Sequence, residues 1–154
     1  MRSDEERTLV LLKPDSIQRG LAGPIISRLE AHGLKLVGCK MLQMDKALAQ
    51  RHYEAHVGKG FFESVVKFMT SAPIIAMAWQ GKGAIDQVRK AMGSTNPAQA
   101  APGTIRGDWA LDIERNLVHA SDGPESAERE LAIFFDGDEI FDFEKDVDRW
   151  LTGS

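Results

Sequence analysis

The sequence lacks several features that would place it in a familiar class. It holds one cysteine, Cys39, among 154 residues, so no intramolecular disulfide can form and we expect a reducing, intracellular setting. Cys39 lies in an apolar stretch, and we expect its thiol to be unreactive. The apolar run near the start, residues 9–12, is far shorter than a signal core or a membrane span. We therefore expect a cytoplasmic protein with no membrane partner.

Neither sign of charge dominates. The sequence has 19 Lys and Arg against 23 Asp and Glu, a net charge of −4, which argues against a nucleic-acid partner because binding to phosphate backbones needs a basic surface. Residues 136–149 hold seven acids and two bases, so the acid is concentrated near the C-terminus. We expect one domain over residues 1–154. Its tail, residues 136–154, carries Phe141, Phe143 and Trp150 and is expected to pack on the body or on a neighbour.

The common short signatures of nucleotide and hydrolase sites are also missing. The nearest approach to a Walker loop, Gly33 to Gly38, has Cys39 where that loop needs lysine. No G-x-G-x-x-G, H-E-x-x-H or G-x-S-x-G pattern occurs. Any phosphate site must therefore be assembled from scattered residues.

The pattern of apolar and turn residues predicts an alternation of strands and helices. Thr8 to Leu12 reads as a strand that ends at Lys13-Pro14, and Phe62, Val65, Val66 and Met69 form a helical stripe. The expected strands are residues 8–12, 34–43, 74–79 and 117–119, and the expected helices are residues 23–33, 45–56, 62–69, 84–92 and 126–135. Residues 94–115 form a long loop with no period. This order predicts an α+β sandwich with helices on one face of a four-stranded sheet.

Three cations are candidates for phosphate binding. Lys13 follows the first strand, Arg89 lies off the apolar stripe of its helix, and Arg106 lies in the long loop. Each alone reads as an ordinary surface charge. If they converge, they could bind a triphosphate, whose three to four negative charges need several cations or a metal.

His119 ends an apolar strand, where a hydrogen-bonded structural histidine is the common interpretation. The alternative is a nucleophile, because a neutral imidazole has a lone pair that can attack phosphorus. Glu130 could return from the next helix to orient the ring, although its pattern alone indicates a surface residue. His52 and His56 have the helical spacing of a metal-binding pair, but no third ligand accompanies them, so we favour an exposed helix face.

Two aromatic residues each allow a structural and a functional interpretation. Tyr53 is the only tyrosine in the sequence, and it could be a packing residue with its hydroxyl at the surface. Phe61 is one step off the helical stripe, so either core packing or contact with a ligand would explain it.

Several segments together resemble one known family. They are Thr8-Leu-Val-Leu-Leu-Lys13-Pro14-Asp15, Phe61-Phe62, Ser71-Ala-Pro73, Thr95-Asn96-Pro97-Ala98, Pro102-Gly103-Thr104-Ile105-Arg106-Gly107-Asp108 and Asn116-Leu-Val-His119-Ala-Ser121-Asp122. Over about residues 7–135 the chain closely resembles nucleoside diphosphate kinases. The resemblance implies a ferredoxin-like fold, a four-stranded antiparallel sheet with helices on its face. It also implies magnesium-dependent transfer of the γ-phosphate of a nucleoside triphosphate, chiefly ATP, to a nucleoside diphosphate.

The resemblance also implies a role for each matching residue. His119 would be the nucleophile of a ping-pong reaction, with Glu130 and Ser121 orienting it and Tyr53 beside the phosphate. Phosphate and ribose contacts would come from Lys13, Arg89, Thr95, Arg106 and Asn116. The base would lie between Phe61 and Ile113, and stacking on a ring reads no base edge, so little base selectivity is expected. No residue would bind metal directly, because Mg²⁺ would be held mainly through the nucleotide phosphates.

Two positions depart from the family pattern. Ala120 stands where the family usually has Gly, and Gly123 replaces a common Ser; neither change removes a catalytic group. The resemblance implies a homo-oligomer, for which we favour a hexamer and keep a tetramer or dimer open. Two alternatives remain: a non-catalytic nucleotide-binding or scaffolding member of the fold, and a single-strand nucleic-acid module.

Overall fold

The computed structural model describes residues 1–153 and contains a four-stranded sheet with the strand order β2-β3-β1-β4. The strands are β1 (Glu5–Leu12), β2 (Lys35–Leu42), β3 (Ile74–Lys82) and β4 (Val118–Ala120). Every neighbouring pair is antiparallel, so the predicted antiparallel sheet is confirmed. In the register of β1, Val10 pairs with Met77 of β3, and Leu11 pairs with His119 of β4. His119 thus sits on a short edge strand beside a central one.

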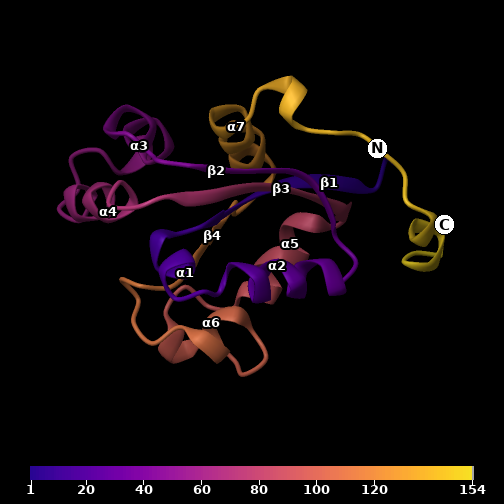
Figure 1. Cartoon of the computed structure of the whole chain (residues 1–154), viewed down its shortest axis with the longest axis horizontal. Helices are drawn as coiled ribbons and strands as arrows, with labels where there is room; N and C mark the ends of the chain where they lie inside the picture. The colour runs from indigo at the N-terminus through magenta and orange to yellow at the C-terminus, as the bar shows by residue number, and fades with distance from the viewer. Residues whose placement is uncertain (154) are drawn as a thin grey trace.

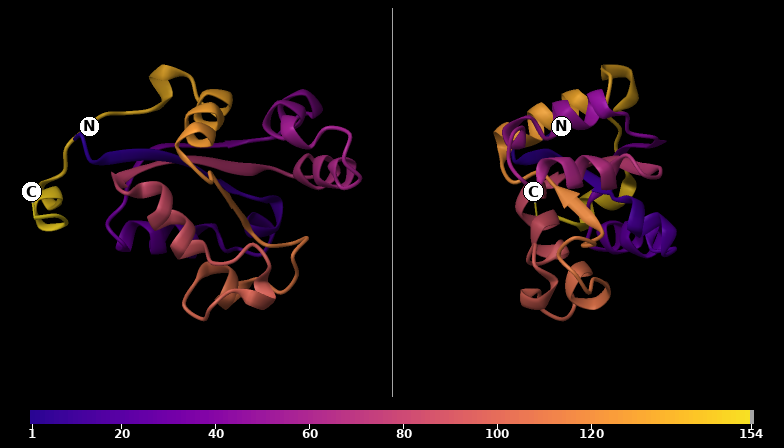
Figure 2. Two further views of the ribbon diagram at one scale, coloured as in Figure 1. Left: turned by 180° about the vertical axis from the view of Figure 1, so that it is seen from behind. Right: turned by 90° about the vertical axis from the view of Figure 1, so that its left-hand side faces the viewer.

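Helices cover both faces of the sheet (Figures 1 and 2). Val10 and Leu12 belong to a core cluster on one face, whereas Leu9 and Leu11 belong to a cluster on the other. Because successive strand residues point to opposite sides, this apolar run without alternation indicates a strand buried on both faces. The prediction that helices cover one face was wrong, because helices pack against each cluster.

The helices divide between these two faces. The helices α2 (Ala22–Ala31) and α5 (Ala84–Met92) cover the first cluster, and α3 (Lys46–His52), α4 (Phe62–Met69) and α7 (Pro124–Phe134) cover the second. Figure 2 shows α7 and α3 on one side of the sheet and α5 and α2 on the other. Residues 84–92 match the predicted helix at both ends. No helix among residues 1–153 is long and apolar enough to cross a membrane.

Short elements account for most differences from the predicted pattern. Residues 94–115 are not one irregular loop, because they contain the 3-10 turn η2 (Pro97–Gln99) and the helix α6 (Ile105–Trp109). The helix α1 (Pro14–Gln18) was not predicted. The helix that follows Asp45 ends at His52, and a 3-10 turn, η1 (Glu54–His56), continues the chain. Each of these pieces is too short to show a hydrophobic period.

The C-terminal segment lies along the outer edge of β2. It contains the 3-10 turns η3 (Gly137–Glu139) and η4 (Asp146–Trp150). The backbone N–H of Phe141 donates to the carbonyl of Val37 at 2.9 Å, and Nζ of Lys35 donates to the carbonyl of Phe143 at 2.7 Å. The segment therefore supplies partners to an edge that would otherwise present unpaired groups. Cys39 on β2 is exposed, and partial burial raises the pKa of its thiol, which disfavours the reactive thiolate.

Candidate active site

A pocket of about 390 Å³ opens where β4 and the end of β1 meet α3, α5 and α7. Eight of the residues expected to bind the nucleotide or to act in catalysis line it, although they are spread over almost 120 positions: Lys13, Tyr53, Arg89, Thr95, Arg106, Asn116, His119 and Glu130. Ser121 lies behind the wall and reaches the pocket only through Glu130. The fold thus brings most of the scattered candidates to one place.

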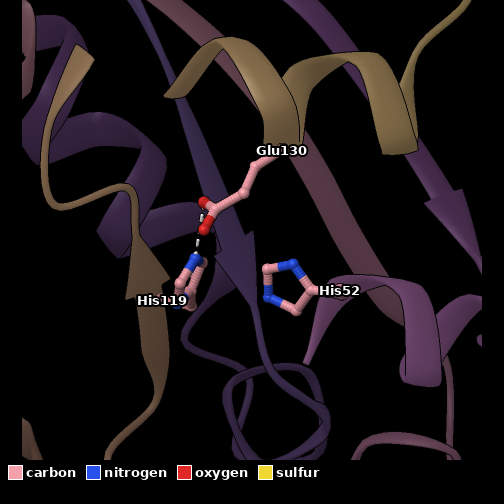
Figure 3. A group of neighbouring side chains, drawn as sticks. All are labelled: His52, His119 and Glu130. Carbon is pink, nitrogen blue, oxygen red and sulfur yellow. Dashed lines mark hydrogen bonds and ion pairs between the residues drawn. The ribbon is translucent and has the colours of Figure 1, made fainter. Parts of the chain in front are cut away.

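The side chains of His119 and Glu130, which both line this pocket, point toward each other (Figure 3). Nε2 of His119 lies 2.9 Å from Oε1 of Glu130, and the hydroxyl of Ser121 donates to the same oxygen at 2.7 Å. Glu130 comes from the inward face of α7 and is 5% exposed, while the His119 side chain is 25% exposed. Glu130 is therefore a buried partner of the imidazole, contrary to the surface position that its pattern alone indicated.

The ionisation of Glu130 fixes which nitrogen of His119 carries the proton. Burial alone would raise the pKa of Glu130, but the hydrogen bond and charge of His119 and the hydrogen bond from Ser121 lower it below its ordinary value. A carboxylate only accepts hydrogen bonds, so Nε2 carries the hydrogen and Nδ1 keeps its lone pair. Nδ1 makes no hydrogen bond with any residue in the part of the chain that the structure describes.

Arg106 is held by three backbone carbonyls. Its Nη2 donates to Val118 at 2.7 Å, its Nη1 to Gly93 at 2.9 Å and its Nε to Asn116 at 3.2 Å. Burial and then repulsion from Arg89 lower the pKa of Arg106 to about 10, so the guanidinium stays charged at neutral pH. The helix α6, whose N-cap Thr104 accepts from the backbone N–H of Gly107, positions this side chain.

Lys13 is the second fixed cation. Its Nζ donates to Oδ1 of Asn116 at 2.9 Å, and Nδ2 of Asn116 donates in turn to the carbonyl of Thr95 at 3.0 Å. Burial first, and repulsion from Arg106 second, lower the pKa of Lys13 to about 8. Arg89 is exposed and makes one contact, from Nη1 to the carbonyl of Ala120 at 3.3 Å. These cations are crowded and incompletely paired, as expected where an anion binds.

The chain is strained where it enters β4. Leu117 has a φ of 76°, the only positive value at a non-glycine position in the described part of the chain, and a branched side chain disfavours that region. The carboxylate of Asp15 accepts from the Leu117 N–H at 3.0 Å, and the Lys13 N–H donates to the Leu117 carbonyl at 2.9 Å. Contacts from the end of β1 and from α1 thus hold a costly turn two residues before His119.

His52 is buried beside the catalytic candidate and is not on an exposed helix face. It is 4% exposed, and its ring stands perpendicular to that of His119 with centroids 4.7 Å apart. Burial first, then repulsion from His119, lowers the pKa of His52 to about 3, so this imidazole is neutral. Burial, followed by the charge of Glu130, raises the pKa of the neighbouring Tyr53, whose hydroxyl can therefore donate across the whole physiological range.

The two residues expected to hold a base lie outside this pocket. Phe61 is 50% exposed and Ile113 is 53% exposed, and neither lines the cavity. The ring of Phe61 lies 5.3 Å from that of His56, which does line it. The exposed apolar surfaces of both side chains are available to a ligand.

Sequence reasoning did not include some residues of the pocket wall. Asp122, Ser126 and Arg129 line the cavity, and His52 belongs to a cluster with His119 and Glu130 rather than to a pair with His56. No pattern in the sequence marks Arg129 as a pocket residue except its place directly before Glu130 on α7. Burial of His52 depends on the packing of α3 against α7, which no local pattern contains.

A family model described as nucleoside diphosphate kinase matches residues 6–140. Among curated proteins named nucleoside diphosphate kinase, the one from Chloroflexus aggregans is 57% identical over 148 residues, covering 95% of this chain and 98% of its own length. The one from Natronomonas pharaonis is 54% identical over 150 residues, covering 97% and 98%. These likenesses extend over nearly the whole of each chain.

Two solved structures from the nucleoside diphosphate kinase family are also similar to this chain. A halophilic nucleoside diphosphate kinase from Halobacterium salinarum, solved in complex with CDP, superposes with a TM-score of 0.94 at 49% identity and covers 96% of this chain and 99% of its own. A nucleoside diphosphate kinase family protein from Babesia bovis superposes with a TM-score of 0.93 at 39% identity, with the same coverage. The expected resemblance and the expected fold are confirmed.

Proposed function

Because this chain belongs to the nucleoside diphosphate kinase family, we propose that it transfers the γ-phosphate of a nucleoside triphosphate to a nucleoside or deoxynucleoside diphosphate through phosphorylated His119. The protein is a phosphotransferase, as the family and its relatives indicate. One observation carries the mechanistic proposal. His119 is held at Nε2 by a buried carboxylate while Nδ1 makes no hydrogen bond within the described residues, and the same pocket is lined by Lys13, Arg89 and Arg106.

In the first half-reaction the lone pair of Nδ1 attacks the γ-phosphorus. An Nδ1–P bond forms, the bond from the γ-phosphorus to the β,γ-bridging oxygen breaks, and the nucleoside diphosphate leaves with that electron pair. The ring then carries both a phosphoryl group and the Nε2 proton, so it is an imidazolium. The carboxylate of Glu130, 2.9 Å from Nε2, stabilises this positive charge. A second nucleoside diphosphate reverses the step with its own terminal oxygen.

The cations of the pocket serve the phosphoryl group in both directions. Lys13, Arg89 and Arg106 can contact equatorial oxygens, whose charge is spread in the transition state. Arg106 is preorganised by its three carbonyl contacts and so loses little freedom on binding. The two half-reactions exchange nearly equivalent phosphoryl bonds, which supports ping-pong kinetics.

The nucleoside would extend from the pocket toward Phe61 and Ile113, with Asn116 near the ribose. Both apolar side chains are half exposed, and stacking on a ring selects weakly among bases. The Halobacterium salinarum relative was solved with CDP, which supports a nucleoside diphosphate as a ligand. We therefore propose broad use of bases, with ATP as the main donor.

Magnesium is proposed as the metal that accompanies the nucleotide. Of the two carboxylates in the pocket wall, Glu130 is engaged by His119 and Ser121, whereas Asp122 is exposed. Asp122 accepts a hydrogen bond from the hydroxyl of Ser126, and Mg²⁺ is seldom held by protein groups alone because it usually keeps several waters and binds substrate phosphates. The ion would be held mainly through the nucleotide phosphates, and it would neutralise their charge. A cytoplasmic location and a homo-oligomer, with a hexamer favoured, remain expectations.

Incubation with ATP labelled at the γ-phosphate tests the proposal. We expect an acid-labile, alkali-stable phosphoprotein that loses its label when CDP is added. His119→Ala should take up no label while binding nucleotide and melting as the parent does. His32→Ala is the matched control, because His32 is exposed and outside the pocket. A parent protein that takes up no label would support the non-catalytic alternative, and a labelled His119→Ala variant would defeat the assignment.

A further inference from the structure

His52 has an unsatisfied environment that the proposed reaction does not explain. It is 4% exposed, and neither ring nitrogen has a hydrogen-bond partner in the described part of the chain. Leaving a buried polar group without a partner costs about 1–3 kcal/mol, and nearly all such groups in folded proteins are satisfied by protein, water or an ion. An imidazole offers a nitrogen donor of the kind that transition metals bind.

Two further donors lie next to His52. One nitrogen of His52, one of His119 and one carboxylate oxygen of Glu130 all lie within 4.8 Å of one another. They come from α3, β4 and α7, and Figure 3 shows the three side chains converging on one space. Donors around a tetrahedral zinc ion are roughly 3.4 Å apart when its bonds are about 2.1 Å long. Nε2 of His119 and Oε1 of Glu130 are already 2.9 Å apart, so modest movements of the three side chains would place their donors around an ion.

We propose that His52, His119 and Glu130 form a binding site for a divalent transition ion of the zinc type, separate from the magnesium carried by the nucleotide. Two imidazoles and one carboxylate are a ligand set that Zn²⁺ accepts at protein sites with an open fourth position. Mg²⁺ prefers oxygen ligands and octahedral geometry. The pocket of about 390 Å³ gives an ion access to the cluster.

Binding of such an ion and phosphorylation of His119 exclude each other; this consequence rests on the proposed function. A metal bond at Nδ1 would use the lone pair that attacks phosphorus. A metal bond at Nε2 would displace its proton and break the hydrogen bond to Glu130. The metal would then withdraw electron density from the ring. In either case the zinc-bound protein is inactive, and chelation restores activity.

The binding test needs no turnover. Calorimetric titration of the nucleotide-free protein with Zn²⁺, in excess Mg²⁺, should give one ion per chain, and His52→Gln should weaken binding at least tenfold. His56→Gln is the matched control, because His56 follows on the same segment and lines the same pocket but is outside the cluster. No binding, binding that survives His52→Gln, or an equal loss in His56→Gln would each overturn the site.

A second measurement on the unmodified chain guards against misfolding of the His52 variant. Nitrogen NMR shifts of the four histidine rings, followed during Zn²⁺ addition, should move for His52 and His119 and not for His32 or His56. Movement of His32 or His56 in place of His52 would overturn the site. Labelling by ATP is measured separately, so a protein that binds zinc but takes up no label would defeat the proposed function and leave the zinc site standing.

Discussion

At the scale of single residues, the chemistry of His119 depends on what holds its other nitrogen. Glu130 accepts from Nε2, and Ser121 donates to the same carboxylate oxygen and keeps it in place. The pair therefore decides the tautomer and also balances the charge that appears on the ring when Nδ1 is phosphorylated. Glu130 touches the reacting ring, whereas Ser121 acts only through Glu130 and is a positioning residue.

Glu130→Gln should lower turnover by on the order of 100-fold or more, because the amide cannot balance the imidazolium and can turn its N–H₂ toward the ring. Ser121→Ala should lower it by about tenfold, since one hydrogen bond to a charged group contributes roughly 1.5 kcal/mol. Steady-state kinetics and the melting temperature of each variant measure these effects. Equal losses in the two variants, or a fully active Glu130→Gln, would contradict this division of roles.

The lowered pKa of Lys13 predicts how phosphoryl transfer depends on pH. Its pKa is lowered to about 8, so the ammonium that binds phosphate is present below that pH and lost above it. The value of kcat/KM for ATP should therefore fall as the pH rises through about 8. Lys13→Arg should remove this decline, because a guanidinium stays charged. Lys82→Arg, an exposed control on β3, should retain it. A profile that is flat from pH 7 to 10 would count against Lys13 as the titrating group.

Some of these residues could be predicted from the sequence and others could not. Lys13 and Arg106 were identified as cations, and the resemblance brought Glu130 to His119. The prediction that His52 lies on an exposed helix face was wrong. Helical spacing pairs His52 with His56, whereas the packing of α3 against α7 turns its ring toward His119. Contacts between remote elements determine burial, and a local pattern does not contain them.

At the scale of elements, the short helix α6 carries Arg106 into the pocket and depends on a glycine. A Cβ at Gly107 would lie 1.9 Å from the carbonyl oxygen of Ala101 and 2.7 Å from the Thr104 hydroxyl. The close approach lets Thr104 cap the helix through the Gly107 N–H at 3.0 Å. Any side chain at this position must therefore move the turn that places Arg106.

Gly107→Ala should lower the free energy of unfolding by at least about 2 kcal/mol and raise the KM for ATP. Gly137→Ala is the control, because Gly137 lies in η3, has no positive φ, and a Cβ there meets nothing within 4 Å. That control should change the free energy of unfolding by no more than about 0.5 kcal/mol. Denaturant unfolding measures both variants, and an unchanged midpoint for Gly107→Ala would show that α6 tolerates the added carbon.

The predictability of each element follows its length and its boundaries. The ranges of α4 and α5 were predicted at both ends, because each has a regular apolar stripe and Gly93 follows α5. The helices α1 and α6 have five residues each, too few to show a period. For α6, the turn residues around it indicated a loop, and Thr104 as its N-cap was the one local signal.

At the scale of the whole molecule, the pocket exists because the sheet order brings remote segments together. β1 lies between β3 and β4, so Lys13 after β1 and His119 on β4 are neighbours despite a separation of more than 100 positions. The two core clusters on opposite faces hold α5 and α7 against this sheet. The strand order could not be derived from periodicity, and the resemblance was used only to predict a four-stranded antiparallel sheet.

The most direct test of the account is to locate the phosphorus on the enzyme labelled by ATP, using phosphorus and nitrogen NMR. Nε2 of His119 is held by Glu130 and Nδ1 is unpaired, so we predict a single phosphohistidine at Nδ1 of His119 with the Nε2 proton retained. A phosphoryl group on Nε2, on another histidine or on a hydroxyl would contradict the mechanism proposed here.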